Sequence, residues 1–256
     1  MKYIFIFFKI FFLLNLNATY AREIGQTEIT ADNGVEVFQD EKFYILKDNV
    51  KIISDNFELF GDLIKIYFEK DLYDIQKIDA KGSVILTSEE YGIDGKGDML
   101  FFEVDLEKIS ISGNSSKLNT NEMMMSSDGE IIVENIDGKF FIEGPNSNLT
   151  AEDIYIDGNN IYGEFIKNNE GNEIIFLDVK DNNESYIKTE DTEMFSKKAI
   201  YNKDSSLIEL FDNVKIIRGS EVVNGDYGTL DTKNNSYKVK SNNNNKVKVI
   251  ITNKNE

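Results

Sequence analysis

Apolar and polar residues alternate along much of the chain. The segment 100–106 carries an apolar residue at every second position, and the segments 63–68 and 246–251 have the same period of two. Asn, Asp and Gly separate these segments at intervals of roughly 8 to 12 residues, which is typical of β-sandwiches, barrels and rolls. Helical spacing is not sustained anywhere after the first residues. The pattern therefore predicts an all-β protein.

The strand-like segments include an internal repeat. The hexapeptide Asp48–Ile53 recurs letter for letter as Asp212–Ile217, and a Gly-Asp pair follows each copy at the same distance, at residues 61–62 and 225–226. A weaker copy occupies 82–86. Each unit is interpreted as strand, turn, strand, with its glycine at a strand start, where glycine indicates a bulge or a close approach of two backbones.

A polar stretch, Gly113–Gly129, interrupts the pattern and includes Met123–Met125. It is a candidate loop or boundary that would divide the chain into halves, 22–112 and 130–256. The methionines could form a flexible lipid contact, because Met adapts to irregular apolar surfaces, but buried filler is the favoured interpretation.

The N-terminus has the layout of a secretory signal peptide. Lys2 and Lys9 accompany an aromatic and aliphatic run that ends at Asn15, and Thr19 and Ala21 supply small residues before a cleavage site. A membrane anchor needs about 20 apolar residues, which this run does not reach. We expect cleavage after Ala21, a mature chain of 22–256 and export to the periplasm; a retained anchor is the alternative.

Composition excludes several classes of function. Removing the two signal lysines takes the formal net charge from −18 to −20, which disfavours nucleic-acid binding. The chain contains no His and no Cys, so a Ser-His-Asp triad and a typical zinc site are excluded. Carboxylate-only glycoside chemistry needs just two acids, but no pair stands out. The Asp-rich turn at 157–160 does not match a known calcium loop. We expect no enzyme activity, metal or cofactor.

Two segments near the N-terminus, Ile29–Glu36 and Phe43–Val50, resemble the opening of the organic-solvent-tolerance-like family, the periplasmic bridge proteins of lipopolysaccharide export. That family repeats a phrase of Gly- or Asp-Asn-Val, strand, small residue-Gly-Asp, strand, and both copies of the repeat match it. The resemblance covers most of 28–102 and 198–251, whereas 113–191 fits poorly.

The resemblance implies a twisted antiparallel β-jelly roll with an apolar interior and open, stackable ends. It implies transport of lipopolysaccharide or a related glycolipid between the membranes, with inner- and outer-membrane export components, and further copies of the chain, as partners. Alternation then predicts an inward apolar face that is both protein core and lipid path: Val50, Ile52, Ile64, Ile66, Phe68, Val84, Leu86, Leu100, Phe102, Val214 and Ile216.

The last strands are the candidate docking edge, because a free sheet edge can pair with a partner's strand. Its apolar residues alternate with lysines: Tyr237, Val239, Val247 and Val249. The lysines could equally protect the edge from aggregation.

Two other classes of function remain. The chain could be the membrane-anchored partner of the bridge, or a relative of the periplasmic domain of the outer-membrane translocon. A secreted β-solenoid, either an adhesin or a polysaccharide-active enzyme, is less favoured, because the repeat is irregular and tryptophan is absent.

Overall fold

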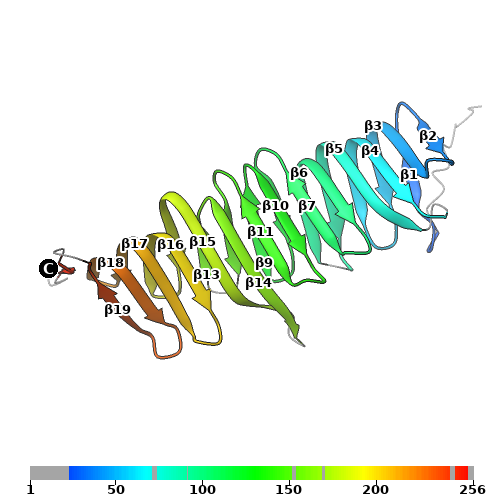
Figure 1. Ribbon diagram of the computed structural model, residues 1–256. Coiled ribbons are helices and arrows are strands. Elements are labelled where there is room, and N and C mark those ends of the chain that lie inside the picture. Colours follow the sequence, from blue (N-terminus) through cyan, green and yellow to red (C-terminus); the bar gives the residue numbers. More distant parts are fainter. Residues whose placement is uncertain are drawn as a thin grey trace, which may run out of the picture.

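The computed structural model describes residues 23–70, 74–90, 92–151, 154–168, 171–242 and 246–252. These residues form one elongated 20-stranded antiparallel sheet that folds on itself (Figure 1). The described ranges contain no helix. The predicted all-β antiparallel architecture is confirmed, while the predicted signal peptide lies outside the described residues.

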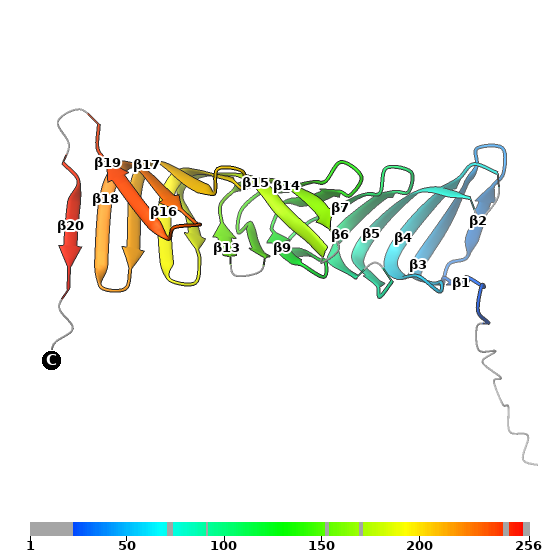
Figure 2. The same cartoon turned by 90° about the horizontal axis from the view of Figure 1, so that it is seen from below.

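The strands stack as rungs along the long axis of the molecule, and each rung pairs with the next (Figure 2). Eight long strands each form a complete rung, four in the N-terminal part and four in the C-terminal part. They are β3 (Phe43–Ile53), β4 (Glu58–Phe68), β5 (Ile75–Ser88), β6 (Ile93–Glu103), β15 (Gly171–Lys188), β16 (Thr192–Asn202), β17 (Leu207–Arg218) and β18 (Glu221–Asp231).

In the middle of the molecule each rung is divided into two short strands. They are β7 (Lys108–Ser112), β8 (Ser116–Asn119), β9 (Met123–Ser127), β10 (Glu130–Glu134), β11 (Lys139–Glu143), β12 (Asn148–Ala151), β13 (Ile154–Asp157) and β14 (Asn160–Asn168). The pairs β7/β8, β10/β9, β11/β12 and β14/β13 therefore complete a stack of twelve rungs within the described residues.

The segment Gly113–Gly129 is part of this stack. It contains β8 and β9, which pair with each other and with β6 and β12, so a polar loop between two halves is not what the structure shows. Met123 and Met125 are buried, whereas Met124 is 55% exposed, as strand alternation requires. Met123 and Met125 thus pack into the core, which fits the favoured interpretation, and lipid contact by the methionines stays a prediction.

Every rung bends once, and the bends align along one long edge, which we call the corner edge. In β3 the bend is at Asp48 and Asn49, which have φ of 61° and 47°; Asp212 and Asn213 of β17 have 61° and 55°. Asp and Asn tolerate this left-handed region better than most residues do. The sequence pattern predicts Asn and Asp as separators between strands, but here the pair bends a single strand, and the ladder register shifts there.

Gly-Asp pairs lie at the bends of three rungs, at residues 61–62 in β4, 97–98 in β6 and 225–226 in β18. Their aspartates bind the backbone of the neighbouring rung: the Asn114 amide donates to Asp98 Oδ2 (3.1 Å), and the Asn242 amide donates to Asp226 Oδ2 (2.7 Å). At Gly82 (φ 81°) a Cβ would lie 2.3 Å from Asp62 Oδ2, which explains the glycine at that bend. The repeated Asp-Asn and Gly-Asp residues therefore form bends along the corner edge.

Beside the bends, buried serines satisfy backbone carbonyls. Ser127 Oγ donates to the Glu143 carbonyl (2.7 Å), and Ser185 Oγ donates to the Ser196 carbonyl (2.7 Å). An unpaired carbonyl at these buried positions would be costly, so the serines stabilise the bend.

The bends divide the sheet into two facing walls. Wall A contains β7, β10, β11 and β14, wall B contains β8, β9, β12 and β13, and the long strands run through both. Alternate side chains of both walls fill one continuous apolar core between them. Opposite the corner edge, the turns of each wall form a rim, rim A and rim B, and no strand connects the two rims among the described residues. We call this side the open edge.

Short strands cover each end of the stack. β1 (Glu28–Thr30) and β2 (Val35–Phe38) pair with β3 at the N-terminal end, and β19 (Ser236–Lys240) and β20 (Lys248–Ile251) pair with β18 at the C-terminal end. At both ends one short strand extends wall A and the other extends wall B, so each wall ends in an edge strand (Figure 2).

Candidate functional site

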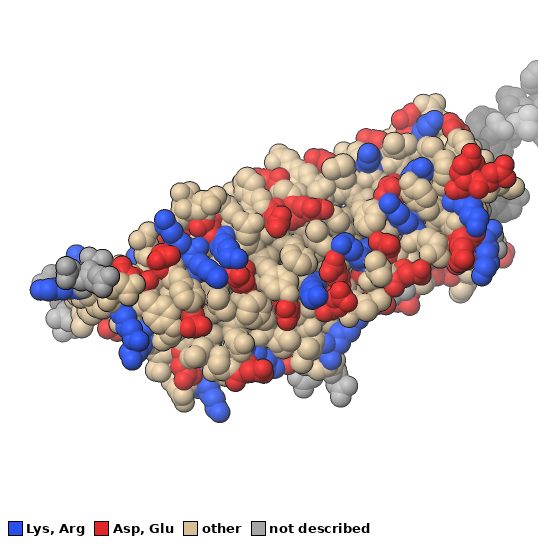
Figure 3. Space-filling model, in the orientation of Figure 1, with Lys and Arg blue, Asp and Glu red and all other residues tan. Residues whose placement is uncertain are grey.

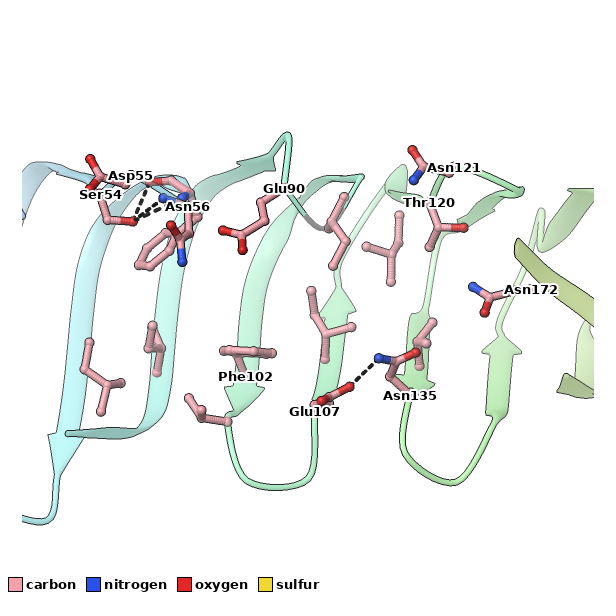
Figure 4. Close-up of a pocket in the computed structure, with 18 of the residues that line it drawn as sticks. Ser54, Asp55, Asn56, Glu90, Phe102, Glu107, Thr120, Asn121, Asn135 and Asn172 are labelled. Carbon is pink, nitrogen blue, oxygen red and sulfur yellow. Dashed lines mark hydrogen bonds between the residues drawn. The ribbon is translucent and has the colours of Figure 1, made fainter. Parts of the chain in front are cut away.

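A groove lies along the open edge, between the two rims. It has a volume of about 900 Å³, and its lining residues run from Gly25 to Asn172. Figure 4 shows its two borders: Ser54, Asn56, Glu90 and Asn121 come from rim B, while other residues project from rim A on the opposite side. The groove therefore opens sideways over the N-terminal part and middle of the roll.

The floor of the groove is apolar. Ile109, Leu118 and Met123 are buried in it, and Phe57 and Phe102 are half-buried at the level where the core meets solvent. Except for Phe57, which lies in the turn before β4, they occupy alternating inward positions of the two walls, so the groove is the outer surface of the core. Burial of a CH₂ group is worth about 0.8 kcal/mol, so this floor favours alkyl chains.

The borders of the groove are polar, and four of their five charged residues are acidic. Glu90 and Glu122 come from rim B and Glu107 from rim A. Glu107 accepts a hydrogen bond from Asn135, and Lys167 Nζ lies 3.9 Å from its carboxylate. The arrangement separates an apolar floor from a hydrated border, which suits an amphipathic ligand.

The structure places the predicted inward residues as alternation requires. Nine of them are buried in the core, while Leu86 and Phe102 are half-buried; the nine are Val50, Ile52, Ile64, Ile66, Phe68, Val84, Leu100, Val214 and Ile216. Of the eleven, Phe102 lines the groove. That they contact a lipid stays a prediction.

Other groove residues did not emerge from the sequence. Leu118 lies in the polar middle segment, where Met123 was named only as the less favoured lipid contact, and Ile109 and Val133 lie in short strands of five residues whose alternation is brief. Phe57 belongs to the turn before β4. A signal was present in Lys108–Ser112, where isoleucine and serine alternate, but it spans few positions.

The candidate docking edge lies at the C-terminal end. Tyr237 and Val239 are half-buried in β19, Val249 is 51% exposed in β20, and Val247 immediately precedes β20. Both strands pair with β18 on one side. Docking of a partner there stays a prediction.

Among the residues described, no group of three or more His, Cys, Asp or Glu side chains is arranged to hold a metal ion. Within those ranges, too, a helix long and apolar enough to cross a membrane is absent. The geometry thus defines the protein by its fold and its groove: an elongated antiparallel roll that opens to solvent along one side.

Comparison with known proteins identifies the family. Residues 28–159, more than half of the chain, match the family model described as LptA/(LptD N-terminal domain) LPS transport protein. The chain belongs to this family of lipopolysaccharide-transport proteins, which confirms the resemblance predicted from the sequence.

A solved structure similar to this chain is that of LptH from Pseudomonas aeruginosa, described as the LptA-homologous periplasmic component of the lipopolysaccharide transport device. The two share 8% sequence identity, with 89% of this chain and 96% of that chain covered and a TM-score of 0.23. No curated protein matches the chain.

Proposed function

We propose that this protein is a periplasmic bridge that carries lipopolysaccharide, or a related glycolipid, from the inner to the outer membrane. The observation that carries the proposal is the sideways-opening apolar groove in a chain of the lipopolysaccharide-transport family. Acyl chains lie on the apolar floor of the groove, between the two rims, and the sugar-bearing head group stays in water beyond the rims.

The energetics favour such a carrier. An acyl chain with about 12 methylenes costs about 10 kcal/mol to expose to water, at about 0.8 kcal/mol for each CH₂. A continuous apolar floor removes most of that cost without bond chemistry. The absence of His and Cys from the sequence is consistent with a carrier that is not an enzyme.

The ends of the roll fit end-to-end assembly. β2 and β1 would continue walls A and B beyond β19 and β20 of a second copy. Because twelve rungs alternate in direction, β19 and β2 of successive copies would meet antiparallel. The ladder would then continue without a break.

Charge supports the same arrangement. Residues 23–41 include six acidic residues and no Lys or Arg, whereas 236–252 include four lysines and no acid. Figure 3 shows acidic side chains at the N-terminal end with basic ones beside them, and both signs are mixed over the long face in view. Opposite charges on the two ends steer association. The same edges suit the inner- and outer-membrane components of the export machine.

The neighbouring residues Phe101 and Phe102 offer a matched test. Phe102 lines the groove, and Phe101 lies on the opposite face of β6, where it contacts Lys77 Nζ (4.4 Å from the ring centroid). A photoreactive phenylalanine analogue at 102 should crosslink to lipopolysaccharide in cells, and the analogue at 101 should not. Equal labelling from both positions would contradict a sheltered lipid path.

Bridge and anchored partner differ at the N-terminus. A bridge is expected to begin near Arg22 in the periplasmic fraction, and N-terminal sequencing of the purified protein measures this directly. Retention of Met1 in the membrane fraction would favour the anchored partner.

A further inference from the structure

The open edge is joined by side chains near the C-terminal end. Arg218 ends β17 on rim B, and Asn235 lies in the β18–β19 turn on rim A. Arg218 donates from an Nη atom to the Asn235 carbonyl (2.8 Å), and the other Nη donates to the Asn235 side-chain oxygen. These hydrogen bonds cross from one rim to the other.

A third residue, Asp191, holds the Arg218 side chain in place through hydrogen bonds. Asp191, in the β15–β16 turn on rim B, accepts from Arg218 Nε (3.0 Å) and from an Nη atom (2.6 Å). Asn235 Nδ2 also donates to Asp191 (3.1 Å), and Thr192 Oγ1 donates to its other oxygen (2.8 Å). Asp191 therefore holds both the arginine and the asparagine, so the three side chains act as a unit.

A second contact crosses the open edge beside them. Tyr237 in β19 hydrogen-bonds to the Glu221 carboxylate at the start of β18; burial and that bond raise the pKa of Tyr237 to about 12. Tyr237 pairs with Leu230 of wall A, whereas Glu221 pairs with Arg218 at rim B. The two walls are thus connected at Asn235 and again at Tyr237, two residues further along the chain.

A similar side-chain contact crosses the open edge in the middle of the roll, and the groove lies on the N-terminal side of that contact. Asn172 Nδ2 on rim A donates to Glu122 Oε2 on rim B (3.3 Å), and Asn172 is the last residue that lines the groove. The side opening thus belongs to the N-terminal part and the middle, and the C-terminal rungs are held together across their rims.

We propose that Arg218, Asp191 and Asn235 form a latch that closes the open edge at the C-terminal end of the roll. A lipid enters the groove sideways, but its head group passes along the open edge to the C-terminal end only when Arg218 releases Asn235. The role in lipid movement rests on the proposed function, whereas the latch itself does not.

The absence of native cysteine makes the latch directly measurable. Ser220→Cys and Lys233→Cys place spin labels on exposed positions of rim B and rim A, on either side of the latch. Pulsed electron paramagnetic resonance should give a narrow distance distribution in the otherwise unchanged chain. Arg218→Ser should broaden it and shift it to longer distances, and Arg218→Lys, which keeps the charge without the planar fork, should give an intermediate result.

A second label pair is the control. Asn56→Cys and Asp105→Cys lie on exposed positions of opposite rims beside the groove, so their distance should not respond to Arg218→Ser. Circular dichroism confirms that each variant is folded. A distribution at 220/233 that Arg218→Ser leaves unchanged would overturn the latch.

Lipid movement is measured with fluorophore-labelled lipopolysaccharide loaded on the full chain and transferred to acceptor vesicles. Arg218→Ser should raise the transfer rate several-fold, and a short bifunctional thiol crosslink between 220 and 233 should lower it below that of the parent. If Arg218→Ser broadens the 220/233 distance distribution but leaves the transfer rate unchanged, the latch does not control lipid movement. The proposed function itself fails on a different result, equal labelling from 101 and 102.

Discussion

The two copies of the hexapeptide Asp48–Ile53 and Asp212–Ile217 occupy equivalent places in different surroundings. Val50 and Val214, and likewise Ile52 and Ile216, are each 1% exposed. Both Asp-Asn pairs make the same left-handed bend. Identical residues thus build identical rungs near opposite ends of the roll.

The difference begins with the next residue, Ser54 in the first copy and Arg218 in the second. Ser54 Oγ accepts hydrogen bonds from the amides of Asn56 (3.2 Å) and Phe57 (3.1 Å), so it stabilises its own turn beside the groove. Arg218 instead reaches across to rim A. The repeat determines the rung, and the residue that follows determines whether the edge is open or closed.

The largest expected effect concerns the shared core. Ile52→Ala and Ile216→Ala should each lower the free energy of unfolding by about 2–5 kcal/mol, because each leaves a cavity in a close-packed interior. Urea unfolding followed by circular dichroism measures this. Ile85→Ala, at a 43% exposed outward position, is the control and should cost less than about 0.5 kcal/mol. A small loss for one copy alone would show that the two rungs are not packed equivalently.

A smaller effect separates the two ends of the molecule. Replacing the four lysines within 236–252 (Lys238, Lys240, Lys246 and Lys248) by Glu should weaken end-to-end association roughly tenfold or more, since exposed ion pairs contribute about 0.2–1 kcal/mol each. Sedimentation velocity at low salt measures the change, and added salt should weaken association of the parent.

Two further double variants test whether the charges of the two ends are responsible for the association. Glu28→Lys with Glu36→Lys should restore association with the lysine-reversed chain. Lys96→Glu with Lys117→Glu, on an exposed long face, should have no effect. If the lysine-reversed chain associates as the parent does, the charges of the two ends do not determine assembly.

The smallest expected effect is a pH dependence of the latch. Hydrogen bonds from Arg218, Thr192 and Asn235 lower the pKa of Asp191 from 3.8 to about 2. Because the folded-state pKa is the lower one, the contribution of Asp191 is complete above about pH 4 and is lost as pH falls through 2. The neighbouring charged group Glu221 and the neutral Tyr237 also face this cluster.

The 220/233 label distance should therefore stay narrow from pH 7 to 5 and broaden between pH 4 and 2. The same pair in the Arg218→Ser chain should not respond over that lower range. Broadening that is already complete at pH 5 would mean that another group controls the latch.

The sequence predicted the strands and their inward faces because alternation is a local property with a period of two. Ile64 and Ile66 could be assigned to the core from their neighbours alone, and both are buried. The meaning of Asp48-Asn49 could not be assigned in this way. A left-handed pair can end a strand or bend it, and the choice depends on whether the residues beyond it pair with the same neighbour, here β4.

The groove could be predicted only in part, because local alternation does not determine how the walls are arranged in space. Alternation identifies inward positions such as Phe102, but it does not say which of them lie deep between the walls and which lie at the rim. The latch was not predictable at all. Asp191, Arg218 and Asn235 are separated by 27 and 17 residues, and only the stacking of rungs brings their turns together.

The charged, unlike ends of the roll have a consequence for symmetry. A contact between two different surfaces of identical subunits is heterologous, and it builds an open filament unless its rotation closes a ring. An assembly of this chain would therefore have a polarity, with one exposed acidic end and one exposed basic end at every length. Its growth would be limited by protein concentration and by whatever terminal components cap those two ends. If copies assemble end to end as proposed, the number of rungs and the placement of ten charged side chains would give a polar filament of variable length.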